Sequence, residues 1–261
     1  MAGFIFIFKK KMEEALNEFI EHWKSKKHVI GILLTGSYAV GLQNENSDID
    51  IRIIFNNTKK RTIKGLSIIN GFKFSYLGRN HEITRKIFNT QFLNQEKRES
   101  YIFNIGKILY DKSGEVQRLI DLAYTYVNTP TLLKPKTQDI IRTSLYALYS
   151  HKNHLISLSE NTPFFYYHYY IFLKQALTSY SNLLNCEPFL DMKTEKLLCD
   201  AEYRRAYHWP NFPDQTFSKM WISIISLEKV NKASVLKLYE YIENKIGKVD
   251  EKKFIISWNE V

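Results

Sequence analysis

One short stretch constrains this chain more than any other. An apolar run, residues 29–34 (VIGILL), ends at Thr35-Gly36-Ser37, and ten residues later an alternating segment, residues 48–55 (DIDIRIIF), begins. A short apolar run stopped by small residues predicts a buried strand that enters a tight turn. Strict alternation predicts a second strand, whose isoleucines face a core while Asp48, Asp50 and Arg52 share the opposite face.

The rest of the first half fits a small α+β unit around these two strands. Residues 11–27 carry apolar side chains at three- and four-residue spacing, which predicts an amphipathic helix. Residues 71–77 alternate after an Asn70-Gly71 turn and predict a third strand. Residues 84–94 and 106–110 predict a helix and then a strand. We therefore expect a small mixed sheet in residues 1–130.

The second half, residues 131–261, shows a different pattern. Its segments are rich in Leu, Ile, Tyr and Ala, do not alternate, and are separated by prolines. An aromatic run at residues 164–170 predicts buried core positions on a helix. The sequence predicts an all-α helical bundle with helices near residues 138–158, 165–184, 191–205, 216–227 and 233–246.

The strand-turn-strand segment has the residue types needed to bind a nucleotide. A turn after a strand presents free backbone N–H groups, Gly36 allows a phosphate to approach the backbone, and Ser37 adds a hydroxyl donor. Asp48 and Asp50, two residues apart on one strand face, can hold a divalent cation through carboxylate oxygens. Arg52 continues on that face and can neutralise phosphate charge.

Together these residues resemble the signature of the polymerase-β-like nucleotidyltransferase superfamily. The extended form, GSYAVGLQNENSDIDIR, is similar to the minimal bacterial and the antibiotic-modifying members, which also carry a helical second domain. The resemblance implies an α+β nucleotidyltransferase domain over residues 1–130 and a transfer of a nucleoside monophosphate with loss of pyrophosphate. It also implies that Asp48 and Asp50 are catalytic and bind Mg²⁺, with Mn²⁺ as an alternative, and that Gly36 and Ser37 hold the nucleotide phosphates.

The sequence departs from the family at a third acid. Family members usually place a third carboxylate on a neighbouring strand, where it completes the metal site. Here the corresponding strand offers Lys73 and Ser75. Glu82, or Asp200 and Glu202 from the bundle, could substitute, or the site has two carboxylates.

Composition limits where the protein works and what it binds. The chain has 261 residues, 44% of them hydrophobic, which suits folded cores. Two cysteines without a CxxC pair predict a reducing, cytoplasmic setting and no structural zinc. The apolar stretch at residues 4–8 is too short to cross a membrane, so we expect a protein that is neither exported nor membrane-bound. His151 and His154, three residues apart on a predicted helix, are expected to be surface or boundary histidines and not a metal site.

Two functions remain open at this stage. The first is a Mg²⁺-dependent nucleotidyltransferase that uses an NTP, ATP foremost, and a hydroxyl acceptor that is a small molecule, a protein side chain or an RNA end. The second is a catalytically silent member that binds a nucleotide or RNA as a sensor or partner module. The formal charge of +10 favours anionic partners, makes cationic aminoglycosides poor acceptor candidates, and comes with no DNA-specific motif.

Overall fold

The computed structural model describes residues 2–58, 61–131, 136–187 and 189–256, with side chains from Lys10 onward. It divides into two compact units: unit 1 comprises Met1–Leu132 and Glu202–Trp209, and unit 2 comprises Leu133–Ala201 and Pro210–Val261. The segment Glu202–Trp209, which belongs to the helical half of the sequence, is therefore part of unit 1. In the described residues, no helix is both long and apolar enough to span a membrane.

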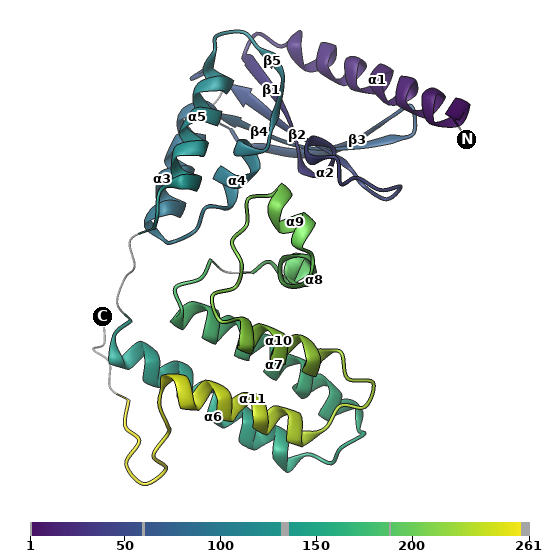
Figure 1. Cartoon of the computed structure of the whole chain (residues 1–261). Coiled ribbons are helices and arrows are strands. Elements are labelled where there is room, and N and C mark those ends of the chain that lie inside the picture. The colour runs from purple at the N-terminus through teal and green to yellow at the C-terminus, as the bar shows by residue number, and fades with distance from the viewer. Residues whose placement is uncertain (1, 59–60, 132–135, 188, 257–261) are drawn as a thin grey trace. The chain divides into compact units, whose positions relative to one another are not determined.

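Unit 1 is built on one mixed sheet (Figure 1). Its strands within the described residues are β1 (Val29–Thr35), β2 (Ile49–Phe55), β3 (Ile63–Ile69), β4 (Phe72–Asn80) and β5 (Lys107–Asp111). They lie in the order β3-β4-β2-β1-β5. The β2 strand pairs antiparallel with β1 and parallel with β4. The α+β fold with a small mixed sheet, predicted from the sequence, is confirmed. The β2 strand, which carries Asp50, lies at the centre of this sheet.

Helices cover both faces of the sheet (Figure 1). The helices of unit 1 are α1 (Ala2–Lys24), α2 (Gly36–Val40), α3 (His81–Leu93), α4 (Arg98–Asn104), α5 (Glu115–Asn128) and α9 (Ala201–Ala206), whose first residue is assigned to unit 2. On one face, Phe19 of α1 packs with the β2 isoleucines and stacks on Phe74. On the other face, α3, α4 and α5 bury Leu33 and Ile54. Asp48, Asp50 and Arg52 belong to the face that carries Ile54, because side chains alternate along β2.

Four elements of unit 1 are absent from the sequence-based expectations. They are the strand β3, the helices α4 and α5, and the short helix α2, because only a turn was expected at Gly36. The β3 strand is an edge strand with one face in solvent, and its Leu66 and Ile68 are 63% and 74% exposed. An apolar exposed face masks the polar alternation by which half-buried strands are recognised. The turn between β3 and β4 does fall at Asn70-Gly71, and both residues have positive φ angles.

Unit 2 is helical, as predicted. Its helical segments are α6 (Gln138–Ser157), α7 (Pro163–Leu183), the 3₁₀ turn η1 (Asp191–Lys193), α8 (Thr194–Cys199), α10 (Gln215–Ile225) and α11 (Lys232–Ile246). The single helix expected at residues 191–205 is wrong. It breaks at Asp200, which has extended backbone angles, because the chain there leaves unit 2 and enters unit 1.

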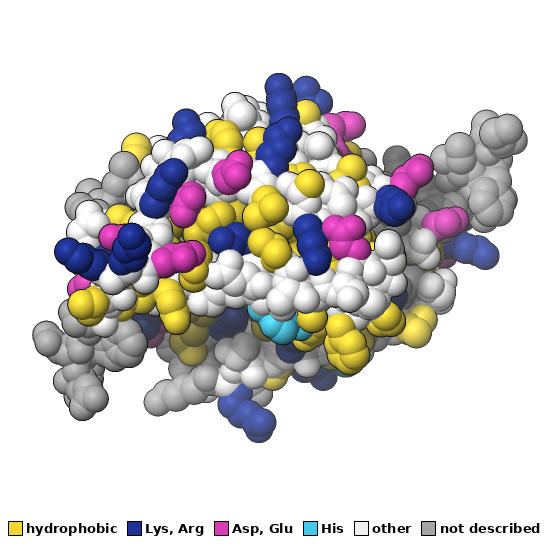
Figure 2. Space-filling model, turned by 90° about the horizontal axis from the view of Figure 1, so that it is seen from below, with side chains coloured by type: hydrophobic (Ala, Val, Ile, Leu, Met, Phe, Trp, Pro, Cys, Tyr) yellow, Lys and Arg dark blue, Asp and Glu magenta, His cyan; other side chains and the backbone are white. Residues whose placement is uncertain are grey.

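The aromatic run on α7 is only partly in the core. Phe165 and Tyr169, one helical turn apart, are fully buried, whereas Phe164, Tyr167 and Tyr170 are exposed. The expectation of a buried run therefore holds for one side of the helix, since residues three and four apart share a face. Figure 2 shows one face of the molecule, on which hydrophobic side chains are interspersed with lysine, arginine and carboxylate side chains.

Candidate functional site

The turn after β1 is held against β2. Thr35, the last residue of β1, lies opposite Asp50 in the antiparallel register, and its Oγ1 donates a hydrogen bond of 3.2 Å to the carbonyl oxygen of Asp50. Gly36 follows with a φ angle of 66°, a conformation that favours glycine. Ser37 is the next residue, in the first turn of α2. The Gly36–Ser37 turn identified from the sequence therefore lies next to β2, at the position of Asp50.

Gly36 approaches the Asp50 carboxylate directly. A Cβ atom at position 36 would lie 2.1 Å from Oδ2 of Asp50, far inside any ordinary contact. The absence of a side chain therefore makes room for the carboxylate group. This close approach joins the two halves of the sequence motif, which are separated by ten residues in the chain.

Asp48 lies immediately before β2, on the same face as Asp50. Its Oδ2 forms an ion pair of 3.0 Å with Nζ of Lys73, which lies on β4. In the parallel register Ser75 pairs with Asp50. The position on the neighbouring strand where the family pattern has an acid is therefore taken by a serine beside Asp50 and by a lysine beside Asp48.

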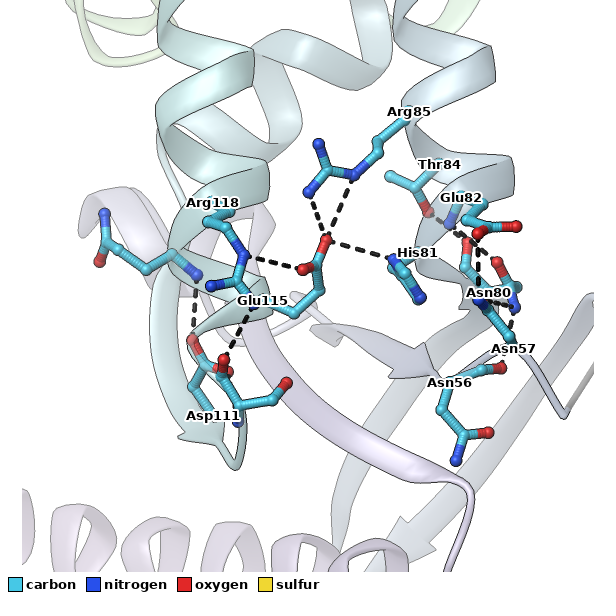
Figure 3. Close-up of polar contacts among 12 residues, drawn as sticks. Asn56, Asn57, Asn80, His81, Glu82, Thr84, Arg85, Asp111, Glu115 and Arg118 are labelled. Atoms are coloured by element: carbon cyan, nitrogen blue, oxygen red, sulfur yellow. Dashed lines mark hydrogen bonds and ion pairs between the residues drawn. The ribbon is translucent and has the colours of Figure 1, made fainter.

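Glu82 cannot complete the carboxylate pair. It lies in the first turn of α3, where its Oε1 accepts a hydrogen bond of 3.0 Å from Nδ2 of Asn57 and its backbone N–H is capped by Asn80 (Figure 3). Asn80 pairs with Phe55 at the far end of β2. Five residues separate Phe55 from Asp50, a distance of about 16 Å along a strand.

The substitutes suggested from the helical half are placed differently from one another. Asp200 lies in unit 2, whereas Glu202 is exposed at the start of the unit 1 segment. Across the described residues, no group of three or more His, Cys, Asp or Glu side chains is arranged to hold a metal ion. Among the described residues, Asp48 and Asp50 are therefore the carboxylates available to a cation at β2.

Arg52 is engaged in a nearly buried charge network. Its Nε donates a hydrogen bond of 3.2 Å to Oε1 of Glu99, which also accepts one of 3.4 Å from Nη1 of Arg79. Glu99 is only 8% exposed. Burial lowers the pKa of Arg79, an effect opposed by the Glu99 charge and reinforced by Arg52. Sequence reasoning missed Glu99, because 47 residues separate it from Arg52 and it follows no motif.

The segment Glu202–Trp209 contributes aromatic side chains to unit 1. Tyr203 and Tyr207 stack with ring centroids 4.3 Å apart, and Trp209 contacts Tyr101 of α4 at 5.1 Å. Burial raises the pKa of the Tyr207 phenol, and the neighbouring Tyr203 and the negative charge of Asp50 raise it further. Tyr207 therefore lies within electrostatic range of the candidate catalytic carboxylate. No local pattern could have indicated this proximity, since 157 residues separate Tyr207 from Asp50.

A cavity of about 420 Å³ adjoins Asp48 within unit 1. Its walls come from Lys11 of α1, Tyr38 of α2, the loop at residues 45–48 and the β3–β4 turn with Lys73. Both hydrogen-bonding and aromatic side chains line it. The cavity therefore places open space beside the Asp48–Lys73 ion pair.

A second polar cluster lies on α3 and α5, away from these aspartates. Glu115 pairs with His81, Arg85 and Arg118 (Figure 3). Burial raises the pKa of Glu115, but the hydrogen bonds from Arg85 and Arg118 outweigh it, so that the pKa lies below its ordinary value. This cluster ties α3 to α5.

The histidines noted in the sequence belong to unit 2. Nε2 of His154 on α6 lies 3.2 Å from Nε2 of His168 on α7. Burial lowers the pKa of His168, and the nearby His154 and His151 lower it further. One of these two nitrogens donates the hydrogen bond and the other accepts it.

Comparison with known proteins identifies the family. No curated protein sequence matches the chain. Among solved structures, the nucleotidyltransferase-like protein from Exiguobacterium sibiricum is similar, with 12% identity and a TM-score of 0.43 over 90% of this chain and 74% of that one. The sequence profile described as nucleotidyltransferase domain matches residues 12–142, half of the chain, and this span contains both aspartates and Gly36, which faces Asp50. The chain therefore belongs to the nucleotidyltransferase domain family.

Proposed function

We propose that this protein transfers a nucleoside monophosphate from an NTP, with ATP as the first candidate, to a hydroxyl acceptor. The observation that carries the proposal is the close approach of Gly36 to the Asp50 carboxylate, with Asp48 on the same strand face. This juxtaposition puts a phosphate-binding turn and a pair of cation-binding carboxylates side by side. Family membership supports nucleotidyl transfer as the general reaction.

The donor set suits Mg²⁺, or Mn²⁺ in its place. Mg²⁺ prefers hard oxygen ligands and is usually bound by one or two protein carboxylates together with substrate phosphates and water. Asp48 and Asp50 supply two carboxylates, and the missing side chain at Gly36 gives the Asp50 carboxylate room beside the turn. When bound, the cation would neutralise triphosphate charge and orient the phosphates for in-line attack.

The residues of the chain have separable roles in this proposal. Gly36 lets the triphosphate approach the backbone, and Ser37 offers its hydroxyl as a donor. Arg52, held by Glu99, supplies positive charge near the phosphates. The acceptor oxygen attacks the α-phosphorus, and the bond to the β-phosphate breaks with release of pyrophosphate and a proton.

In the described residues, the acceptor side of β2 lacks a third acid in this proposal, although Glu45 lines the cavity beside Asp48. Lys73 and Ser75 line the side of β2 where a third acid would lie. A cationic aminoglycoside would therefore find poor electrostatic complementarity. We infer a neutral small molecule, a protein side chain or an RNA end as the acceptor. The two free cysteines suit a reducing cytoplasm as the setting.

The second candidate is a catalytically silent protein of the same fold that binds nucleotide or RNA. The observation that favours it is the absence of an acid opposite Asp50, where Ser75 stands. Such a protein would bind Mg²⁺ and ATP at the same aspartates without turnover.

One experiment separates the two candidates. The protein is incubated with Mg²⁺ and each of the four NTPs, and pyrophosphate release and self-labelling are measured with acceptor pools of small hydroxyl compounds, proteins and RNA. Asp50→Asn keeps the side-chain shape but removes a metal-binding charge, so turnover should collapse while the melting temperature changes little. Asp139→Asn, the same change on an exposed position of α6, is the control. Full turnover by Asp50→Asn would refute the assignment, and tight ATP binding without turnover would favour the silent protein.

A further inference from the structure

Lys73 lies beside one of the two carboxylates that are proposed to bind the cation. It is on β4, one residue before the Phe74–Ile49 pair of the parallel register, and its ammonium lies 3.0 Å from Oδ2 of Asp48. An oxygen of one of the two aspartates proposed to bind the cation therefore already faces a positive charge. Ser75, opposite Asp50, adds no negative charge.

This arrangement changes the electrostatics of the pair. Two carboxylates and one ammonium leave a net charge of −1, where three carboxylates would give −3. A divalent cation that approaches from water must displace or tolerate the ammonium, and Mg²⁺ gives up its own water reluctantly. The free cation is therefore held weakly.

The ammonium can nevertheless be displaced easily. The Lys73 side chain is 51% exposed and that of Asp48 is 30% exposed, and ion pairs in contact with solvent contribute little free energy. Lys73 also lines the cavity of about 420 Å³ beside Asp48, so its side chain can move into open space without disturbing the sheet. The ion pair between Lys73 and Asp48 can therefore open at little cost in free energy.

We propose that Lys73 is a tethered cation that occupies Asp48 until a divalent cation arrives together with the triphosphate. The triphosphate supplies the oxygen ligands that the strand lacks, and its negative charge offsets the repulsion between the cation and the lysine. Lys73 is then a positioning residue that makes cation binding depend on nucleotide binding. This inference rests on the proposed function, because it requires the cation and the NTP to share the site.

The test measures cation binding directly, with Mn²⁺ as the probe. Free Mn²⁺ is followed by electron paramagnetic resonance in titrations of the full chain, with and without α,β-methylene ATP. Lys73→Met removes the ammonium but keeps a long side chain, and Lys64→Met makes the same charge change on the exposed part of β3. A second variant, Ser75→Asp, places an acid opposite Asp50.

Lys73→Met should bind Mn²⁺ alone about fivefold more tightly than the wild type, as expected for loss of a partly exposed ion pair. With the analogue bound, the two proteins should agree within about twofold. Lys64→Met should behave as the wild type, and Ser75→Asp should tighten binding of Mn²⁺ alone. The role of Lys73 would be overturned if Lys73→Met and the wild type bound Mn²⁺ alone with equal affinity. The proposed function would still stand in that case if both proteins bound the complex of Mn²⁺ with α,β-methylene ATP. If neither protein bound that complex, the proposed function itself would fail.

Discussion

Replacing Gly36 with alanine tests the geometry on which the proposed function depends. Two separate effects oppose a side chain there. The φ angle of 66° places an alanine in the left-handed region, at about 1–2 kcal/mol. The new Cβ would also lie 2.1 Å from Asp50 Oδ2, which is 1.3 Å inside the 3.4 Å at which ordinary contacts begin (3.4 − 2.1).

Gly41 separates these two effects. Its φ angle is 78°, yet a Cβ at this position would meet nothing within 4 Å. Gly41→Ala should therefore lower the free energy of unfolding by about 1–2 kcal/mol through backbone strain alone. Gly36→Ala should add a further ~1–3 kcal/mol, as overpacking does in other tightly packed sites.

The functional consequence should differ more than the stability. A catalytic carboxylate forced to move by about 1 Å can reduce turnover on the order of 100-fold, so Gly36→Ala should lose pyrophosphate release while Gly41→Ala keeps it. Urea denaturation gives the stability of each variant, and the pyrophosphate assay gives the turnover. If the two variants matched in both measurements, the approach of Gly36 to Asp50 would have no role, and the argument from it would be refuted.

Three further outcomes are expected. Ser37→Ala removes one donor of several around the phosphate, so NTP affinity measured by calorimetry should fall by about 1 kcal/mol, or fivefold, and a loss of all binding would contradict this. The pKa of Glu115 is lower in the folded protein, so its contribution to stability is present above the unfolded pKa of about 4.3 and is lost as the pH falls through the folded value. Glu115→Gln should therefore reduce the loss of unfolding free energy between neutral and acidic pH, measured by urea denaturation. An unchanged pH dependence would exclude this carboxylate as its cause. Asp50→Asn removes a negative charge near Tyr207 and should shift the ¹³Cζ resonance of that residue at neutral pH, with Tyr207→Phe identifying the signal; an unmoved resonance would place the segment away from Asp50.

Local pattern was enough to predict the central elements. The run at residues 29–34 and the alternation at residues 48–55 became β1 and β2, because a continuous apolar run and a period of two are both recognisable within a few residues of the chain. The Asn70-Gly71 turn was predictable for a similar reason, since both residues accept positive φ angles. The family resemblance rested on these same residues, and the family match confirms it.

Pairings between distant segments could not be derived in this way. Neither the ion pair of Lys73 with Asp48 nor the burial of Glu99 between two arginines follows from a local pattern, because strand register and helix packing decide them. The position of Glu82 could not be predicted either. It was a candidate third carboxylate from the sequence, but its helix begins beside Phe55, about five residues along β2 from Asp50.

The membership of residues 202–209 in unit 1 shows the limit most clearly. By composition this segment belongs to the helical half, yet it packs its aromatic rings with Tyr101 and brings Tyr207 into the field of Asp50. The strands β1, β2 and β4, the Asn70-Gly71 turn and the spacing of the two aspartates could be predicted, since they depend on neighbours within a few residues. The surroundings of the aspartates could not be predicted, because strand register and helix packing bring together residues that lie far apart in the sequence.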